Sequence, residues 1–318
     1  MPLDPQVQAL LDAAAKANLP PMWQLTPDQA RAQYLLRVRR LEPKDEPIYR
    51  VEDRAVPGTD HQIPIRIYRP REANPGELLP VLVWYHGGGF VIGSLDTHDS
   101  ACRRLATLGD CMVVSVDYRL APEWKFPAGV DDSFAALKWI SAHATEIGAD
   151  PARIAVGGDS AGGNLATVCA LLARNAGAPK VAFQLLFYPC IAPEPETPSH
   201  YKFADGYILT RQTITWFYKL YLKSPKDTQD FRFGPLITDD LSQLPPAFIL
   251  VAGYDPLRDE GVQYATRLVE AGNAVTLVNM PGMVHGFLLM SGALDGAVQA
   301  LEQSAAALRS AFTPREKP

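Results

Sequence analysis

The chain has 318 residues, with 30 lysines and arginines against 35 aspartates and glutamates, so its formal net charge is −5 at pH 7. The densest basic stretch, residues 37–40, is too short to offer nucleic acid an electrostatic footprint, and we expect it to be the solvated face of a helix. Hydrophobic residues make up 47% of the chain, yet no apolar run approaches the ~18 residues that cross a bilayer. We therefore expect a soluble protein without nucleic-acid or membrane partners.

The cysteines and the amino-terminal residues predict a cellular location. Cys102, Cys111, Cys169 and Cys190 show neither C-x-x-C nor metal-ligand spacing, and in a chain of this length we expect them to be buried thiols rather than a disulfide framework. Residues 1–4 carry an early acid and begin neither a basic nor an apolar signal region, so no secretory signal is expected. The prediction is a cytoplasmic protein. The oligomeric state is left open, with a homodimer among the states that the sequence allows.

From about residue 48 onward, short β-type runs alternate with helical patterns, an order typical of a mostly parallel sheet covered by helices on both faces. The length allows one large domain with an appended piece. The predicted strands are 48–56, 63–68, 81–85, 112–117, 154–157, 183–188, 247–251 and 275–278. The predicted helices between them are 97–109, 130–147, 161–176, 259–272 and 294–312. Residues 189–198 contain four prolines and indicate an irregular loop.

Two segments do not fit this alternation. Residues 4–45 hold two helical patterns before the first strand, and residues 199–224 place helix-like sequence between the sixth and seventh strands. Because this insertion leaves the sheet at its carboxyl edge, where open α/β folds bind ligands, we expect the two segments to form a lid. A packing buttress without functional role is the alternative. The apolar residues expected to cover the site are Met22, Trp23, Phe203, Tyr207, Ile208, Leu209, Trp216 and Phe217.

The string Gly158-Asp159-Ser160-Ala161-Gly162 stands where a predicted strand ends and a helix begins. This is the context of a G-x-S-x-G nucleophile elbow, in which a serine projects from a strained turn. Gly158 and Gly162 lack the Cβ atoms that would otherwise clash across so tight a turn. A glycine-rich turn that only caps the helix would explain the glycines but not the serine between them. Ser160 is the predicted nucleophile.

A serine nucleophile needs a base that titrates near neutrality, and histidine is the usual one. His285 lies in the loop after the last predicted strand, downstream of Ser160, as the chain order serine, acid, histidine requires. His86 belongs to a glycine loop, where we expect its ring to organise turns. The remaining histidines are expected to be satisfied or solvated, namely His61, His98, His143 and His200.

The acid is expected after the seventh strand, where the chain leads into Asp255. Its role would be to fix the tautomer of His285 and to stabilise the imidazolium without taking the proton. Asp259 and Glu260 lie one helical turn further on and read as a charged helix start. Asp117, after the fourth strand, is a weaker candidate because it precedes the nucleophile.

The string His86-Gly87-Gly88-Gly89 follows the third predicted strand. A tetrahedral oxyanion needs backbone amides that are held in place before the reaction. We assign this role to the amides of Gly88, Gly89 and Ala161, with Gly87 allowing the turn. A flexible glycine loop is the alternative. Chance would place G-x-S-x-G in roughly one such chain in sixteen and HGGG in roughly one in several hundred, so the two together are specific.

These motifs resemble those of the bacterial hormone-sensitive-lipase-like carboxylesterases of the α/β-hydrolase superfamily. The resemblance runs from the N-terminal helices to the last helix, and its motifs lie in residues 86–90, 117–123, 158–164, 255–259 and 285–287. It implies one α/β-hydrolase domain over residues 1–318, with an eight-stranded, mostly parallel sheet and a helical cap formed by about 1–45 and 190–225. It also implies activity on esters of short to medium acyl chains, with no metal and no organic cofactor.

The predicted reaction is the hydrolysis of a small-molecule ester by two successive acyl transfers, first to the serine and then to water. Ser160 attacks the carbonyl with His285 as base, the alcohol leaves with the proton, and water repeats the cycle on the acyl-enzyme. Because acyl-transfer geometry also serves amides, an amidase or a specialised deacetylase is the alternative. Plant hormone receptors resemble these enzymes but lack the catalytic histidine. The intact set of Ser160, Asp255 and His285 argues against such a non-catalytic receptor.

Overall fold

The computed structural model describes residues 2–313. Its framework is an eight-stranded sheet in the order β1-β2-β4-β3-β5-β6-β7-β8. The strands are β1 (Arg50–Pro57), β2 (Gln62–Arg69), β3 (Leu79–Tyr85), β4 (Met112–Val116), β5 (Ala149–Asp159), β6 (Phe183–Phe187), β7 (Ala247–Tyr254) and β8 (Val275–Val284). The six strands from β3 to β8 run parallel, whereas β2 is antiparallel to both of its neighbours. The predicted eight strands and their mostly parallel arrangement are confirmed.

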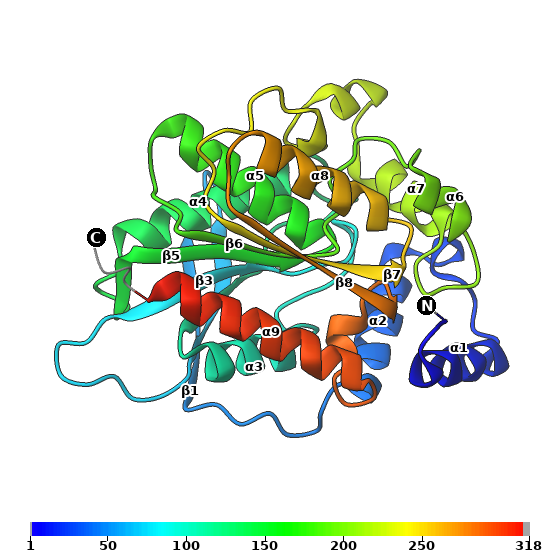
Figure 1. Ribbon diagram of the computed structural model, residues 1–318, viewed down its shortest axis with the longest axis horizontal. Coiled ribbons are helices and arrows are strands. Elements are labelled where there is room, and N and C mark those ends of the chain that lie inside the picture. Colours follow the sequence, from blue (N-terminus) through cyan, green and yellow to red (C-terminus); the bar gives the residue numbers. More distant parts are fainter. Residues whose placement is uncertain (1, 314–318) are drawn as a thin grey trace.

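Helices cover both faces of the sheet (Figure 1). One face carries α4 (Ala128–Ala142), α5 (Ala161–Ala176) and α8 (Arg258–Glu270), and the other carries α3 (Asp99–Gly109) and α9 (Asp295–Phe312). Successive residues of β3 therefore enter opposite cores: Val81 and Val83 pack under the first group, and Leu82 and Trp84 under the second. Because both faces are covered, all seven residues of β3 are buried.

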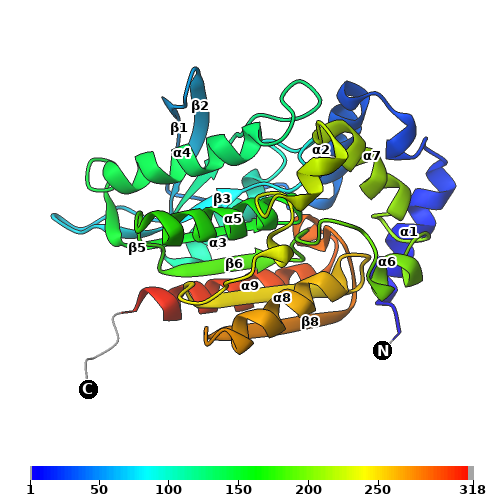
Figure 2. The same ribbon diagram turned by 90° about the horizontal axis from the view of Figure 1, so that it is seen from above.

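The two segments that break the alternation lie together at one end of the molecule (Figure 2). The first contains α1 (Pro5–Ala17), the short 3₁₀ helix η1 (Met22–Gln24) and α2 (Pro27–Leu41), and the second contains α6 (Pro198–Lys202) and α7 (Arg211–Tyr221). α7 contacts η1, so the two segments meet. Figure 1 shows them beyond the ends to which the arrows of β7 and β8 point. This is the place that a lid over the carboxyl edge would occupy.

The N-terminal helices begin at residues whose side chains satisfy free backbone amides. The Asp4 side chain accepts from the amide of Gln6, and Pro5 opens α1. Thr26 and Gln29 form a capping box at the start of α2. Side chains of this kind replace the hydrogen bonds that the first turn of a helix lacks, and proline at the first position loses none. Local sequence therefore sets the two helix starts.

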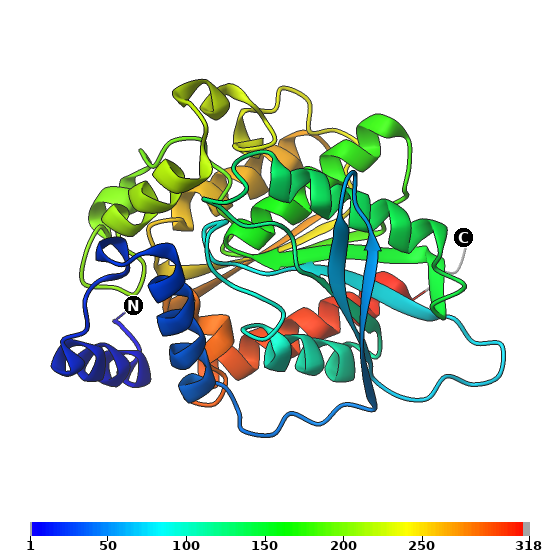
Figure 3. The ribbon, with the colours of Figure 1, turned by 180° about the vertical axis from the view of Figure 1, so that it is seen from behind.

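The predictions made from the sequence for the surface and for the cysteines are confirmed only in part. Seen from behind, β1 and β2 form a hairpin at the edge far from β8 (Figure 3). The basic stretch is not a purely solvated face, because Val38 is buried and the Arg37 guanidinium lies over the ring of Tyr34. All four cysteines are free and buried, as expected. Within residues 2–313, no helix combines the length and apolarity needed to cross a membrane.

Candidate active site

Ser160 occupies the turn between β5 and α5 with φ 54° and ψ −118°, a conformation that L-residues rarely adopt. The neighbouring glycines allow this turn to approach β3. A Cβ on Gly162 would lie 1.9 Å from the carbonyl oxygen of Tyr85, and one on Gly158 would lie 2.4 Å from the same oxygen. The Ser160 amide is held by the carbonyl of Phe187 on β6, at 2.9 Å. The strained elbow expected from the sequence is present.

A hydrogen-bonded chain joins Ser160 to the loops after β8 and β7. Ser160 Oγ lies 2.9 Å from His285 Nε2, and His285 Nδ1 lies 2.8 Å from Asp255 Oδ2. A carboxylate can only accept, so Nδ1 carries the proton and Nε2 accepts from the serine hydroxyl. The other oxygen of Asp255 accepts from the amide of Leu257 at 2.8 Å. The exposed fractions are 8% for Ser160, 8% for His285 and 0% for Asp255, so these three hydrogen-bonded side chains are shielded from solvent, and the acid end is fully closed.

The loop after β3 contacts the serine elbow, because the amide of Gly87 donates to the side chain of Asp159 at 2.8 Å. Gly88 and Gly89 have φ of +123° and +59°, and within residues 2–313 neither amide donates to another protein group. Ala161 is the first residue of α5, where an amide has no acceptor inside the helix. Gly87, expected to allow the turn, has no left-handed φ. A glycine is needed at this position for another reason, because a Cβ on Gly87 would lie 2.3 Å from Oδ2 of Asp159.

Comparisons with known proteins agree with this geometry. Residues 82–289 match the family model of the α/β hydrolase fold. The chain is 44% identical over 316 residues to carboxylesterase NlhH of Mycobacterium tuberculosis, covering 98% of this chain and 96% of that protein. It belongs to the α/β hydrolase family.

Other relatives place this α/β hydrolase among the hormone-sensitive-lipase-like carboxylesterases, and it is an ester hydrolase. Ethyl acetate hydrolase of Pseudomonas putida is 39% identical over 318 residues, covering 97% of this chain and 99% of that protein. The solved esterase of the archaeon Pyrobaculum calidifontis is 42% identical, with a TM-score of 0.90 and coverage of 98% of this chain and all of the other. The predicted family and enzyme class are confirmed.

Asp159 and His98 hold the glycine loop of the hydrolase, a role that the sequence did not indicate for either residue. Asp159 is buried, accepts from the amide of Gly87 at 2.8 Å and pairs with His98 Nε2 at 3.0 Å. Burial raises the pKa of Asp159, but His98 and the Gly87 amide outweigh it, so the pKa ends below its usual value. His86 stacks on Tyr118 with ring centroids 4.4 Å apart, and burial lowers its pKa to about 3. The His86 ring is therefore neutral, which fits the turn-organising role expected for it.

The rival acids of the hydrolase lie away from His285. Asp259 accepts from the amide of Ser199 at 2.9 Å and pairs with Arg258. Asp117 accepts a backbone hydrogen bond from Leu95. Glu260, which read as part of a charged helix start, is instead fully buried. Its side chain accepts two backbone amides from the loop after β6, and only the tertiary fold creates that contact.

The predicted apolar cover divides between two places. The Phe217 ring lies directly over Gly89, because a Cβ there would come within 2.2 Å of the ring. Leu209 is buried in the same core as Phe217. Phe203 and Tyr207 instead pack on Tyr254, with ring centroids 5.5 and 5.2 Å from it.

Trp23 belongs to η1, which contacts α7, and is partly exposed. Phe217 therefore lies at Gly89 of the glycine loop, whereas Phe203 and Tyr207 lie at the residue that precedes Asp255. No cluster of three or more His, Cys, Asp or Glu residues arranged to hold a metal ion occurs in the described part of the hydrolase.

Proposed function

We propose that this ester hydrolase is a serine carboxylesterase in which Ser160 is the nucleophile, His285 the base and Asp255 the orienting acid. The observation that carries the proposal is the continuous hydrogen-bonded chain through these three side chains. Ser160 attacks the ester carbonyl as its proton passes to Nε2 of His285, and the alcohol then leaves with that proton. Water repeats the two steps on the acyl-enzyme and releases the acid. Asp255 keeps the proton on Nδ1 and stabilises the imidazolium.

The amides of Gly88, Gly89 and Ala161 form the oxyanion hole of this proposal. They belong to a loop and a helix start that are fixed before substrate arrives, so they stabilise the negative charge that develops on the carbonyl oxygen. The N-terminus of α5 adds its own positive dipole at the same place. No metal or organic cofactor enters the mechanism.

The substrates we propose are esters of short to medium acyl chains, with a preferred range from butyrate to octanoate. The two segments at about 1–45 and 190–225 form a cap over one α/β-hydrolase domain. The side chains of this cap that contact the substrate are Trp23, Phe203, Tyr207, Leu209 and Phe217. Support comes from the Phe217 ring over Gly89, which puts an apolar wall beside the oxyanion hole. A relative named ethyl acetate hydrolase supports activity on short acyl chains in general. Laurate and longer chains should react poorly under a closed cap.

The direct test is substitution of the nucleophile and the base. We expect Ser160→Ala to lower kcat on p-nitrophenyl butyrate by about four to six orders of magnitude, and His285→Ala to do the same, because triad members act as a unit. Circular dichroism checks that each variant is folded. A tenth of the parent activity in either folded variant would contradict the assignment. With a neutral imidazole as base, kcat/KM of the parent should rise through one inflection on the order of pH 6 to 7 and then level off.

The same assay separates the esterase from the amidase or deacetylase alternative. Matched p-nitrophenyl ester and anilide substrates share the acyl group and differ only in the bond that is broken. A much larger kcat/KM on the ester supports the proposal, and a larger value on the anilide would replace it with an amidase.

A cytoplasmic location and a homodimer stay predictions. The four unpaired, buried thiols support the first, because free thiols persist in a reducing compartment. Cell fractionation tests the location, and sedimentation velocity tests the homodimer.

A further inference from the structure

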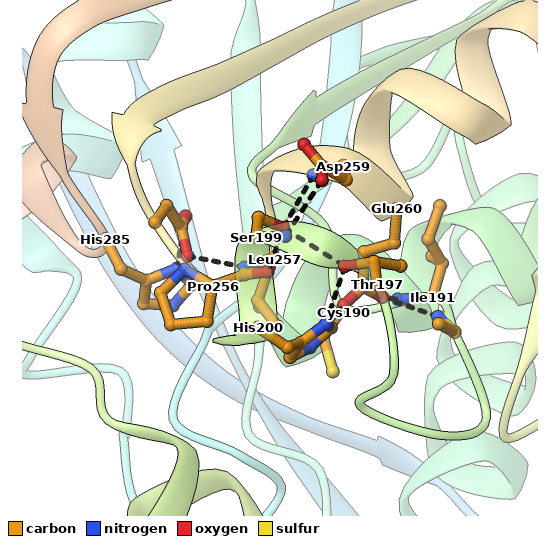
Figure 4. Close-up of polar contacts among 12 residues, drawn as sticks. Cys190, Ile191, Thr197, Ser199, His200, Pro256, Leu257, Asp259, Glu260 and His285 are labelled. Carbon is orange, nitrogen blue, oxygen red and sulfur yellow. Dashed lines mark hydrogen bonds and ion pairs between the residues drawn. The ribbon is translucent and has the colours of Figure 1, made fainter. Parts of the chain in front are cut away.

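A buried carboxylate, Glu260, lies on the first turns of α8, five residues after Asp255. Its side chain has no exposed surface, and one oxygen accepts from the amides of both Ile191 and Ala192 (Figure 4). Burying a charged group is unfavourable unless partners replace its lost water. Here the two backbone amides are such partners, and the role of Glu260 depends on the segment to which these amides belong.

Those amides belong to the segment that backs the serine elbow. The amide of Cys190 donates to the carbonyl of Ser160 at 3.1 Å. The carbonyl of Cys190 accepts from the side chain of Asn164, in the first turn of α5, at 2.8 Å. The segment 190–192 thus touches Ser160 directly, and Glu260 holds it from the other side.

A second buried side chain completes the junction. His200 on α6 has no exposed surface, and its Nε2 lies 3.3 Å from the second oxygen of Glu260. Its Nδ1 lies 2.7 Å from Oγ1 of Thr197. α6 is the first helix of the second cap segment, so this helix is attached to α8 through the pair of His200 and Glu260 (Figure 4).

The loop that carries Asp255 is bound into the same junction. The hydroxyl of Ser199 donates to the carbonyl of Pro256, the residue after Asp255. The Ser199 amide donates to the Asp259 carboxylate at 2.9 Å, and the Asp259 amide donates back to the Ser199 hydroxyl at 3.2 Å. Figure 4 shows these contacts between the start of α6 and the start of α8, with His285 beside them. The first turns of α6 and α8 are therefore clasped together.

We propose that Glu260 is a positioning residue of the catalytic triad, which fixes the distance between the Ser160 elbow and the Asp255 loop by holding residues 190–192 to α8, with His200 extending this link to the cap. The inference rests on the proposed roles of Ser160, His285 and Asp255. Glu260 touches no reacting atom and acts only through the backbone. Its loss leaves two buried amides without an acceptor, and satisfying them requires residues 190–192 to move.

The test compares three variants by kcat, KM and the pH profile of kcat/KM on p-nitrophenyl butyrate. Glu260→Leu keeps the volume and removes both acceptor oxygens, and we expect kcat to fall about 10- to 100-fold with KM changed much less, because small misplacements of reacting groups have effects of this size. A weakened contact between Asp255 and His285 favours the imidazolium less, so the inflection of kcat/KM should move to lower pH by about half a unit. Glu260→Gln keeps an oxygen for both amides, and its nitrogen can donate to the other tautomer of His200. We expect it to restore kcat to within about threefold of the parent.

Leu308→Ala is the matched control for lost stability. Leu308 is buried in α9, on the opposite face of the sheet, where it packs beside Gly109. The cavity should lower the melting temperature without moving kcat or the inflection, assayed well below that temperature. Should Glu260→Leu not fold, Ser199→Ala removes only the hydroxyl clasp. It should change kcat and the inflection in the same directions by several-fold less.

An unmoved inflection with parent-like kcat in folded Glu260→Leu, or in Ser199→Ala when Glu260→Leu does not fold, would overturn the proposal. So would a Glu260→Gln enzyme as impaired as Glu260→Leu, since the acceptor oxygen would then not be what matters. Both results leave the triad assignment intact, because that assignment is decided by substitution of Ser160, His285 and Asp255 themselves.

Discussion

Ser160 is flanked by two buried pairs of a histidine and a carboxylate, one on each side. On the side of the oxyanion loop, Asp159 accepts from the Gly87 amide and pairs with His98 at 3.0 Å. On the side of the acid loop, Glu260 accepts from two amides of the segment 190–192 and pairs with His200 at 3.3 Å. Each carboxylate thus holds a loop that touches the serine elbow.

The two pairs differ in how far they favour the charged carboxylate. Burial raises the pKa of Asp159, yet His98 and the Gly87 amide bring it below the usual value. Burial also raises the pKa of Glu260, and there it outweighs His200 and the two amides, so the pKa stays above the usual value. The oxyanion side is therefore held by a firmly ionised group. The acid side is held by a carboxyl group that takes up a proton more readily as the pH falls.

The largest expected effect is the loss of kcat when the acid itself is replaced, compared with the loss when a residue that holds its loop is replaced. Asp255→Asn should lower kcat on p-nitrophenyl butyrate by about four orders of magnitude, because the amide favours the wrong tautomer of His285. Asp259→Asn keeps an oxygen for the Ser199 amide and should lower kcat by less than about tenfold. A larger loss in Asp259→Asn than in Asp255→Asn would mean that the acid had been assigned to the wrong carboxylate.

A smaller effect is expected from the carboxylate on the oxyanion side. Asp159→Asn weakens the contacts to His98 and to the Gly87 amide, which loosens the loop that carries the oxyanion amides. Since loss of one oxyanion donor lowers kcat by about 10²- to 10³-fold, we expect a displaced loop to lower it by about 10- to 100-fold. The inflection of kcat/KM should stay in place, because the base is untouched. A shifted inflection in Asp159→Asn would contradict the idea that only the acid side acts on the pKa of the base.

Acid should also weaken the fold through His86 on the oxyanion side. The pKa of His86 is lowered to about 3, from an ordinary value of 6.5, because the ring is buried. Below pH 6.5 the unfolded chain therefore binds a proton that the folded chain does not, and the free energy of unfolding falls with pH down to about 3. Between pH 6.5 and 5 this one group should remove between about 1 and 2 kcal/mol.

Urea unfolding of the parent and of His86→Asn at these two pH values measures that contribution. Asparagine does not titrate, so its unfolding free energy should decline less over the same interval. Parallel declines in the two proteins would show that His86 is not the source of the acid sensitivity.

The smallest expected effect concerns the cap residue on the oxyanion side. Phe217→Ala opens space over Gly89, so longer acyl chains should gain relative to acetate by about tenfold in kcat/KM, the lower end of the effect that one methylene has in an apolar pocket. Tyr207→Ala, on the acid side, should change this ratio less. Rates on esters from acetate to laurate decide the matter, and an unchanged ratio in Phe217→Ala would show that its ring does not line the acyl site.

Much of the site was predictable because each key residue follows a strand. Ser160, Asp255 and His285 come directly after β5, β7 and β8, and parallel strands bring their carboxyl ends to one edge. Glu260 could not be recognised, because a carboxylate in the first turn of a helix looks the same whether it faces water or a loop about 70 residues away in the chain. The roles of His98 and Asp159 could not be recognised either, because their contact joins segments about 60 residues apart in the chain.

Glycines show a similar limit. The sequence indicated that the loop after β3 must turn, and Gly88 and Gly89 do have left-handed backbone angles. It could not indicate that Gly87 makes room for the Asp159 carboxylate, since that contact depends on how β3 and β5 are placed side by side. Local conformation was readable from the residues, and close approach between distant segments was not.

The first cap segment is fastened close to the catalytic base. The amide of Asp4 donates to the carbonyl of Gly282 at 3.1 Å, three residues before His285, whereas α9 ends at Phe312 at the far end of the molecule (Figure 1). Attaching this hydrolase to a solid support through the α9 end would therefore leave the two cap segments facing the liquid, while a tether next to Asp4 would pull on the loop that carries the base.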